Sequence, residues 1–277
     1  MPDTISPLLD RIGLRAATFY AGPMSCAIHP FHAAEGLGHL HIIRSGTVLA
    51  EQSGHAPVTI NEPSLIFYPR PVDHQLTPSD ASPASVVCAS VRYEAGRNNA
   101  ITQSFPPVVV IAFRLLPRLE LTLAALFAEA ADHEPGRQIM LDRLCDILLI
   151  QIVRHALSIG LIERGVLAGL SHPRLGVVLT TLLEKPAEPW NVVRMAELAH
   201  WSRNAFSAEF DRVVGTSPAA FLTQVRVASA QKLLRKGVPI ARVAGEVGYG
   251  SQPAFSRAFI REAGVSPSQW LRQAGEN

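Results

Sequence analysis

The last third of the chain contains one segment twice. When residues 195–222 are aligned with residues 244–271, at a fixed offset of 49 positions, eleven of the 28 residue pairs are identical. The identical pairs are Glu197/Glu246, Ser202/Ser251, Ala205/Ala254, Phe206/Phe255, Ser207/Ser256, Phe210/Phe259, Arg212/Arg261, Gly215/Gly264, Ser217/Ser266, Pro218/Pro267 and Leu222/Leu271. Because so many identities at one offset rarely arise by chance, we interpret them as an internal duplication of one helical unit.

Each copy has the pattern of a helix-turn-helix. In the first copy, apolar residues at helical spacing stop at Ala199, and Ser202 follows as the cap of a second helix. That helix carries Phe206 and Phe210 on one face, and Gly215 ends it. The second copy repeats this order with Ser251, Phe255, Phe259 and Gly264. The pattern therefore predicts two helix-turn-helix units in an all-helical domain.

A long helix is predicted between the two units, over residues 218–236. At a rise of about 1.5 Å per residue, this linker helix spans roughly 28 Å. One turn of DNA measures about 34 Å, so the spacing suits a chain that reads two successive major grooves on one face of a duplex.

Positive charge is concentrated in the same part of the chain. Residues 172–277 contain 13 Lys and Arg against 8 Asp and Glu, whereas residues 1–171 contain 12 against 15. The formal net charge of +2 for the whole chain therefore hides a basic C-terminal third. Such a distribution is typical of a module that binds double-stranded DNA.

The duplicated pattern also indicates which side chains face outward. Since the phenylalanines occupy the inner faces, the candidates for contacts with base edges are Arg203, Asn204 and Ser207 in the first copy, and Gln252, Ser256 and Arg257 in the second. The candidates for phosphate contacts are Arg212, Arg226, Lys232, Arg235, Lys236 and Arg261. The alternative for each is an ordinary solvated surface residue.

Residues 172–272 resemble the DNA-binding domain of the AraC/XylS family of bacterial transcriptional regulators. The resemblance rests on Ala244, Gly248, Tyr249, Ser251, Phe255, Phe259, Gly264, Ser266 and Pro267, followed by Trp270 and Arg272. One departure is Ile260, where the family usually has Lys or Arg, and Arg261 is the candidate to replace that phosphate contact. The resemblance implies a sequence-specific regulator, activator or repressor, that works with RNA polymerase.

The N-terminal part of the chain has the pattern of a β structure. Short apolar runs at His39–Val48, Pro57–Ile60, Ser64–Tyr68 and Ser85–Tyr93 are separated by turn-forming residues, as in a small barrel or sandwich. The segment resembles a cupin, the sensor domain of many AraC/XylS regulators. The resemblance rests on His39-x-His41, Gly46, the Asn61-Glu62-Pro63 turn and the stretch from Tyr68 to His74. We therefore expect an N-terminal cupin-like β-barrel.

Three histidines are candidate sensor residues. His39 and His41 lie two positions apart, so they point to the same face of a strand, and His74 of a later strand can join them inside the barrel. Cupin metal sites usually add an acidic ligand soon after the second His, where this chain has Arg44 and Ser45. Two interpretations stay open: a metal ion held by the three histidines, or polar residues that line a pocket without a metal.

The cysteines offer a second route to a sensor. Cys26 and Cys88 belong to the predicted barrel, and an oxidisable thiol there would make a redox switch for an oxidant effector. The alternative for Cys88, within an apolar strand, is a small buried core residue. Cys145 lies among leucines and isoleucines on a predicted helix, so we expect it in the core.

The pattern changes from strands to helices between the two domains. Leu119, Leu123, Leu126 and Phe127 form one apolar stripe, and Ile139, Leu144, Leu148, Ile152 and His155 form another. We therefore predict an α+β chain with a cupin-like sensor domain at residues 1–100, a helical dimerisation and linker region at 101–170, and a DNA-binding domain at 171–277. Within this region, residues 161–170 are expected to be a short linker. The helices pack within the chain or form a homodimer.

The leading functional prediction is a regulator controlled by a small molecule or a stress signal, not an enzyme. The alternative is a metal-dependent cupin enzyme with a DNA-binding appendage, which would need a complete ligand set. A DNA-repair alkyl-transfer protein would need a reactive Cys in a Pro-Cys motif, and none of the three cysteines has one. The N-terminus lacks the pattern of a signal peptide and no stretch is long enough for a membrane helix, so we expect a cytoplasmic protein without membrane contact.

Overall fold

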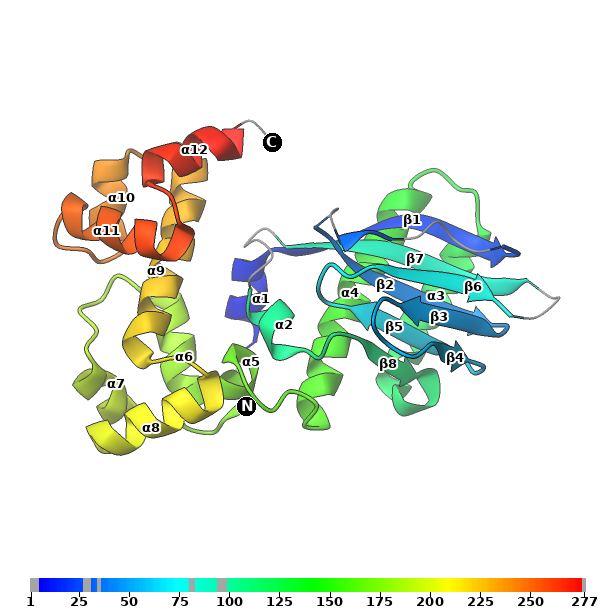
Figure 1. Ribbon diagram of the computed structural model, residues 1–277, viewed down its shortest axis with the longest axis horizontal. Helices are drawn as coiled ribbons and strands as arrows, with labels where there is room; N and C mark the ends of the chain where they lie inside the picture. The colour runs from blue at the N-terminus through cyan, green and yellow to red at the C-terminus, as the bar shows by residue number, and fades with distance from the viewer. Residues whose placement is uncertain (1–4, 27–30, 34–35, 80–82, 94–98, 276–277) are drawn as a thin grey trace. The chain divides into compact units, whose positions relative to one another are not determined.

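Figure 1 shows a computed structural model of the chain, which describes residues 5–26, 31–33, 36–79, 83–93 and 99–275. The chain forms two compact units. One spans Ile12–Ile162, and the other combines the chain from Glu163 onward with the N-terminal segment up to Arg11. Among the described residues, no helix is long and apolar enough to cross a bilayer.

Two antiparallel sheets form the centre of the Ile12–Ile162 unit. The larger sheet has the strand order β1-β7-β2-β5-β8, and the smaller one has the order β4-β3-β6. The strands are β1 (Leu14–Met24), β2 (Gly38–Ser45), β3 (Val48–Gln52), β4 (Val58–Ile60), β5 (Ser64–Tyr68), β6 (His74–Pro78), β7 (Ala84–Tyr93) and β8 (Val109–Ala112). Four of these strands, β2, β4, β5 and β7, match runs expected from the sequence, whereas β1, β3, β6 and β8 were not expected as separate strands.

The larger sheet is buried on both faces. Ile43 of β2 and Tyr68 of β5 pack with Val48 and Leu76 of the smaller sheet in one core between the sheets. Leu40 and Ile42 alternate with this set along β2 and are also fully buried. They point to the opposite face, because successive side chains of a strand alternate.

The two sheets do not close into the expected barrel. Within the described ranges, each ladder joins strands of the same sheet, so the arrangement is a sandwich of five and three strands. The run His39–Val48, expected as one strand, is split at Gly46 between β2 and β3. Gly46 has φ +88°, a left-handed conformation that lets the chain pass from one sheet to the other.

The helices of this unit lie after β7, and α2 precedes the last strand, β8. They are α2 (Ala100–Ser104), two short 3₁₀ segments, η2 (Phe113–Leu115) and η3 (Pro117–Leu119), and then α3 (Glu120–Ala131) and α4 (Arg137–Ser158). Cys145 is fully buried, as predicted, on the inner face of α4 with Leu141 and Leu148. Ile139 was predicted on the same stripe, but it is 58% exposed. It lies two residues from Leu141, which places it about 200° around the helix axis.

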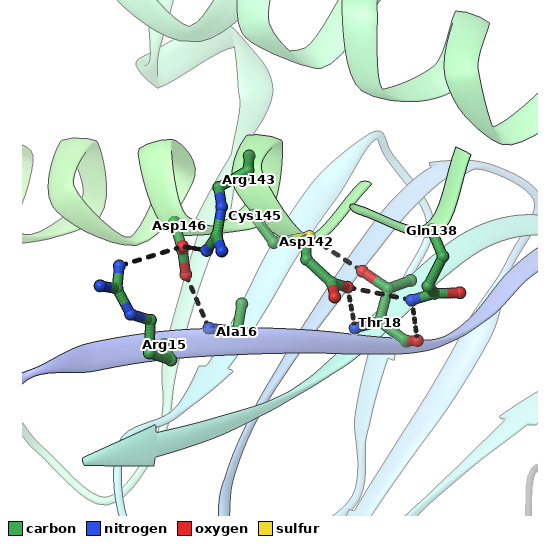
Figure 2. Close-up of polar contacts among 8 residues, drawn as sticks. All are labelled: Arg15, Ala16, Thr18, Gln138, Asp142, Arg143, Cys145 and Asp146. Carbon is green, nitrogen blue, oxygen red and sulfur yellow. Dashed lines mark hydrogen bonds and ion pairs between the residues drawn. The ribbon is translucent and has the colours of Figure 1, made fainter. Parts of the chain in front are cut away.

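Side chains of α4 bind the outer edge of β1 (Figure 2). The carboxylate of Asp142 accepts a hydrogen bond from the backbone N–H of Thr18, and that of Asp146 accepts one from Ala16, both at 2.7 Å. Gln138 adds a hydrogen bond from its amide to the carbonyl oxygen of Thr18. Asp142 and Asp146 are four residues apart, a rise of about 6 Å along a helix. Ala16 and Thr18 are two residues apart, about 6.6 Å along a strand. The two carboxylates are therefore spaced to accept from alternate backbone N–H groups of β1. The helix thus covers an edge strand that would otherwise be open to pairing.

We expect Asp146→Ala to destabilise the sheet unit by about 1–3 kcal/mol, because it leaves the buried N–H of Ala16 without an acceptor. Asp146 also binds Arg143 at 2.7 Å, but that pair is partly exposed and adds little. Hydrogen exchange of the peptide that covers residues 14–24 measures the effect. The exposed Glu134→Ala is the control, and equal protection of β1 in both variants would contradict the role of Asp146.

The second unit is helical. Its helices are α1 (Ser6–Ile12), α5 (Val166–Ser171), α6 (Leu175–Glu184), α7 (Val192–Leu198), α8 (Arg203–Val214), α9 (Pro218–Arg235), α10 (Ile240–Glu246), α11 (Gln252–Ala263) and α12 (Pro267–Gly275). The pairs α7–α8 and α10–α11 are the two predicted helix-turn-helix units, and α9 is the predicted linker helix between them (Figure 1). Residues 166–171 form a helix where the sequence indicated only a linker, because Leu167 and Leu170 are buried.

Candidate nucleic-acid interface and sensor site

Both second helices begin and end as the duplicated sequence predicts. The hydroxyl of Ser202 accepts a hydrogen bond from the N–H of Ala205, and Ser251 accepts one from Ala254. Gly215 and Gly264 terminate α8 and α11. The caps fix where each helix starts, and therefore which side chains occupy its first outward turn.

Phenylalanines set the orientation of α8 and α11. Phe206, Phe210, Phe255 and Phe259 are fully buried, and the two rings of each helix lie 5.5 and 5.6 Å apart between centroids. The opposite faces carry the candidates for base contacts. Arg203, Asn204, Gln252 and Arg257 are exposed, whereas Ser207 and Ser256 are half-buried. In the described part of the chain, the four exposed side chains form no hydrogen bond or ion pair, so their polar groups are available to a ligand.

The candidates for phosphate contacts are less uniform. Arg212 forms a two-point ion pair with Glu209 on α8, and Lys232 lies 3.6 Å from Asp10 of α1. Arg235 packs over the ring of Trp270, 5.1 Å from its centroid. Lys236 at the end of α9 and Arg261 on α11 are exposed.

Arg226 has a different position from the other basic residues. Its guanidinium donates hydrogen bonds to the carbonyl oxygens of Pro186 and Glu188 at 2.8 and 2.9 Å, and it lies over the ring of Tyr249. The residue is half-buried. Its donors therefore connect the linker helix to the loop before α7 and to the turn before α11, rather than facing solvent.

The structure brings the three predicted sensor histidines together inside the sandwich. His41 on β2 and His74 on β6 lie with their Nε2 atoms 3.0 Å apart, and the rings of His39 and His74 are 5.0 Å apart. All three side chains are buried. Phe31 stacks on His74 with ring centroids 4.6 Å apart and was not identified from the sequence, since nothing in its local pattern marks it.

Burial keeps these imidazoles neutral. It lowers the pKa of His39 and of His74 to about 4, and the pKa of His41 well below its usual value, with neighbouring histidines adding to the effect for His39 and His41. His74 donates a hydrogen bond from Nδ1 to the carbonyl oxygen of Val72. Its Nε2 is therefore an acceptor, and His41 donates to it from Nε2. Nδ1 of His41 has no hydrogen-bond partner in the described ranges of the chain.

The same three histidines are the candidate metal ligands. A metal ligand presents a nitrogen lone pair, and in the tautomers assigned above the Nε2 lone pair of His74 already accepts the proton of His41. Arg44 and Ser45 stand where a cupin would supply a carboxylate. Among the residues that the structure describes, no group of three His, Cys, Asp or Glu side chains could hold a metal ion. The observed geometry is that of a hydrogen-bonded imidazole pair.

The candidate redox residues are all free thiols that differ in exposure. Cys26 is exposed, whereas Cys88 and Cys145 are buried. Burial raises the pKa of the Cys88 thiol, and it raises that of Cys145 to about 12. Cys88 lies opposite His41 in the β2–β7 register, but its raised pKa disfavours the reactive thiolate.

Two family models match the chain. A model described as a cupin matches residues 3–158, more than half of the chain, and a model described as a helix-turn-helix domain matches residues 195–273. The two matches coincide with the sheet unit and with the part of the helical unit that contains both duplicated segments.

Curated relatives are transcriptional regulators. An uncharacterized HTH-type transcriptional regulator of Haemophilus influenzae is 40% identical over 124 residues, which cover 44% of this chain but only 42% of that protein. The RCS-specific HTH-type transcriptional activator RclR of Escherichia coli is 29% identical over 78% of this chain and 79% of its own length. The HTH-type transcriptional regulator MtrA of Neisseria gonorrhoeae is 27% identical over 90% of each chain.

The fold, the duplicated helix-turn-helix units and these matches lead to one assignment. The predictions of a cupin domain and of a DNA-binding domain are both confirmed. The chain belongs to the AraC/XylS family of DNA-binding transcriptional regulators and joins an N-terminal cupin domain to a C-terminal domain with two helix-turn-helix units.

Proposed function

We propose that α8 and α11 read two successive major grooves of a promoter. The observation that carries the proposal is the set of four unpartnered polar side chains on the outward faces of the two helices: Arg203 and Asn204 on α8, and Gln252 and Arg257 on α11. Arg pairs with guanine, and Asn and Gln pair with adenine, through two hydrogen bonds each. Ser207 and Ser256 flank these positions and complete the two base-reading surfaces.

Contacts with phosphates come from the basic residues around these helices. Lys236 and Arg261 reach phosphates directly, because both are exposed. Arg212 and Lys232 form ion pairs at the surface, which contribute little to stability and are readily exchanged for a phosphate. Arg235, which packs over Trp270, is a further candidate for such a contact. Arg226 holds the fold together instead, since its hydrogen bonds run to backbone carbonyls.

The cupin domain is the proposed sensor of a small molecule or an oxidant. The buried, neutral cluster of His39, His41 and His74 provides polar groups inside the sandwich, two of which have no partner among the described residues. For an oxidant, Cys26 is the accessible thiol, because Cys88 and Cys145 are buried with raised pKa values. We propose no metal and no turnover at this cluster.

We also propose that the regulator forms a homodimer through α3 and α4. Large apolar side chains are exposed on both helices: Leu121 on α3, which is 85% exposed, and Ile139, Met140 and Ile147 on α4. Large apolar side chains that gather at a surface are typical of a protein interface. In this proposal, the dimer acts on promoters in the cytoplasm and contacts RNA polymerase there.

Substitution of one base-reading arginine and one phosphate-contacting arginine tests the DNA-binding proposal. Arg203→Ala is expected to relax sequence preference and to cost about 1–3 kcal/mol at one base pair, because a bidentate contact is lost. Arg261→Ala is expected to weaken binding evenly across sequences and to reduce the salt dependence by about one phosphate contact. Both effects are measured by fluorescence anisotropy on a promoter duplex and on single-base variants of it.

The two variants act as controls for each other, since both remove an exposed arginine from a duplicated helix. A uniform loss on every duplex in the Arg203→Ala variant would show that this side chain contacts only the backbone. Unchanged binding of both variants would overturn the proposed reading surface.

A further inference from the structure

A surface cavity lies on the sheet unit, outside the sandwich. Its volume is about 360 Å³, which is sufficient for a small organic molecule. It is formed between the 3₁₀ segments η2 and η3 and the C-terminal half of α4. The lining residues are Leu115, Leu116, Pro117, Arg118, Leu119, Gln151, Arg154, His155 and Ser158.

The lining of this cavity is positively charged. Arg118 and Arg154 both line it, and neither forms a hydrogen bond or an ion pair with any residue in the described ranges. The lining contains no carboxylate. The end of α4 carries a partial charge of about −0.5 from its helix dipole, which two guanidinium groups outweigh. The site therefore attracts an anion, and guanidinium groups bind carboxylates with paired hydrogen bonds.

Apolar residues form a further part of the lining. Leu115, Leu116, Pro117 and Leu119 supply this apolar wall, and Leu115 is about half exposed, so apolar surface faces the opening. Gln151 also lines the cavity, and its buried Oε1 atom has no hydrogen-bond partner in the part of the chain described. A simple inorganic anion would satisfy the arginines but would leave the apolar wall uncovered.

We propose that this cavity binds a small organic carboxylate with an apolar body. The carboxylate pairs with Arg118 and Arg154, and the apolar body covers the leucines of the 3₁₀ segments. Binding joins η3 to the end of α4, which stops at Ser158, only a few residues before the helical unit begins at Glu163. The cavity is therefore an effector site, a role that rests on the proposed regulatory function.

Calorimetric titration of the full chain with three matched probes tests the site. The probes are 4-phenylbutyrate, 4-phenylbutan-1-ol and 4-phenylbutylamine, which share an apolar body and differ in charge. We expect saturable binding of the carboxylate with a dissociation constant of about 1 mM or tighter, and at least tenfold weaker binding of the alcohol and the amine. Absence of carboxylate binding, or equal binding of all three, would overturn the proposal.

Variants of the two arginines locate the site. Arg118→Gln and Arg154→Gln are each expected to weaken carboxylate binding about tenfold, and the double variant is expected to abolish it. Arg92→Gln, which removes an exposed arginine of β7 in the same unit, is the control and should bind like the wild type. Each side chain is exposed, so folding is preserved and is checked by a thermal melt. Wild-type affinity in the double variant would place the carboxylate elsewhere and overturn the site.

Measurement of DNA binding on the same samples separates the site from its regulatory role. We expect 4-phenylbutyrate to change the affinity of the wild type for a promoter duplex and to have no effect on the double variant. Carboxylate binding without a change in DNA affinity would overturn the effector role. A wild type that binds the carboxylate but no DNA would contradict the proposed function and leave the ligand site standing.

Discussion

Replacement of Phe206 by Ala is expected to lower the free energy of unfolding of the helical unit by about 3–5 kcal/mol, because a fully buried aromatic ring is lost and a cavity remains. Phe206 is 0% exposed, and its ring lies against Phe210. Urea denaturation followed by tryptophan fluorescence measures the change. The three tryptophans, Trp190, Trp201 and Trp270, all belong to this unit, so the signal reports its unfolding alone.

The loss should also remove specific DNA binding, since Phe206 orients the outward face of α8. Ile260→Ala is the matched control, because Ile260 is an apolar residue of the equivalent helix α11 that is 46% exposed. We expect this control to change stability by less than about 0.5 kcal/mol. If Phe206→Ala unfolds at the same urea concentration as the control, the ring is not the central anchor of the first helix-turn-helix.

The helical domain could be predicted because its signals are local. The caps Ser202 and Ser251 and the buried phenylalanine pairs lie within a few residues of the helices that they define, and the duplication repeats each signal. Long helices whose apolar residues recur at helical spacing can also be predicted without knowledge of distant contacts. The boundaries of α8, α9 and α11 therefore follow from the sequence to within a residue or two.

The sheet unit was predicted less completely because strands depend on distant partners. β1 pairs with β7, some 70 residues later, and its outer edge is covered by carboxylates of α4. The choice between a barrel and a sandwich is made by ladders between such segments, which no local pattern records. Ile139 was assigned to the wrong face of α4 for a similar reason. The local sequence does not distinguish an exposed apolar residue of a helix from a buried one.

The candidate sites show the same division. The convergence of His39, His41 and His74 follows from strand alternation, and the structure contains it. The cavity at Arg118 and Arg154 could not be predicted, because the two arginines are 36 residues apart and belong to different elements. Arg226 was predicted as a phosphate ligand from its charge alone, whereas the fold surrounds it with carbonyl acceptors from a loop about 40 residues earlier.

The two helix-turn-helix copies differ at their turns. In the first turn the left-handed residue is His200, with φ +55°, whereas in the second it is Gly248, with φ +89°. Gly248 is needed for a further reason. A Cβ atom there would lie 2.7 Å from the carbonyl oxygen of Ala187 and 2.9 Å from the guanidinium of Arg226. The second turn thus packs against the backbone of the loop before α7, and this contact fixes one helix-turn-helix on the other.

Gly248→Ala is therefore expected to destabilise the helical unit by about 3 kcal/mol or more, from a strained left-handed residue and a clash with backbone that cannot move aside. Because the clash separates the two helix-turn-helix units, affinity for a promoter with two half-sites should fall more than affinity for a single half-site. Tryptophan fluorescence in urea and anisotropy on both duplexes measure these effects. Gly250→Ala is the control, since a Cβ there meets no atom within 4 Å. Equal stability of the two variants would show that the junction does not hold the units together.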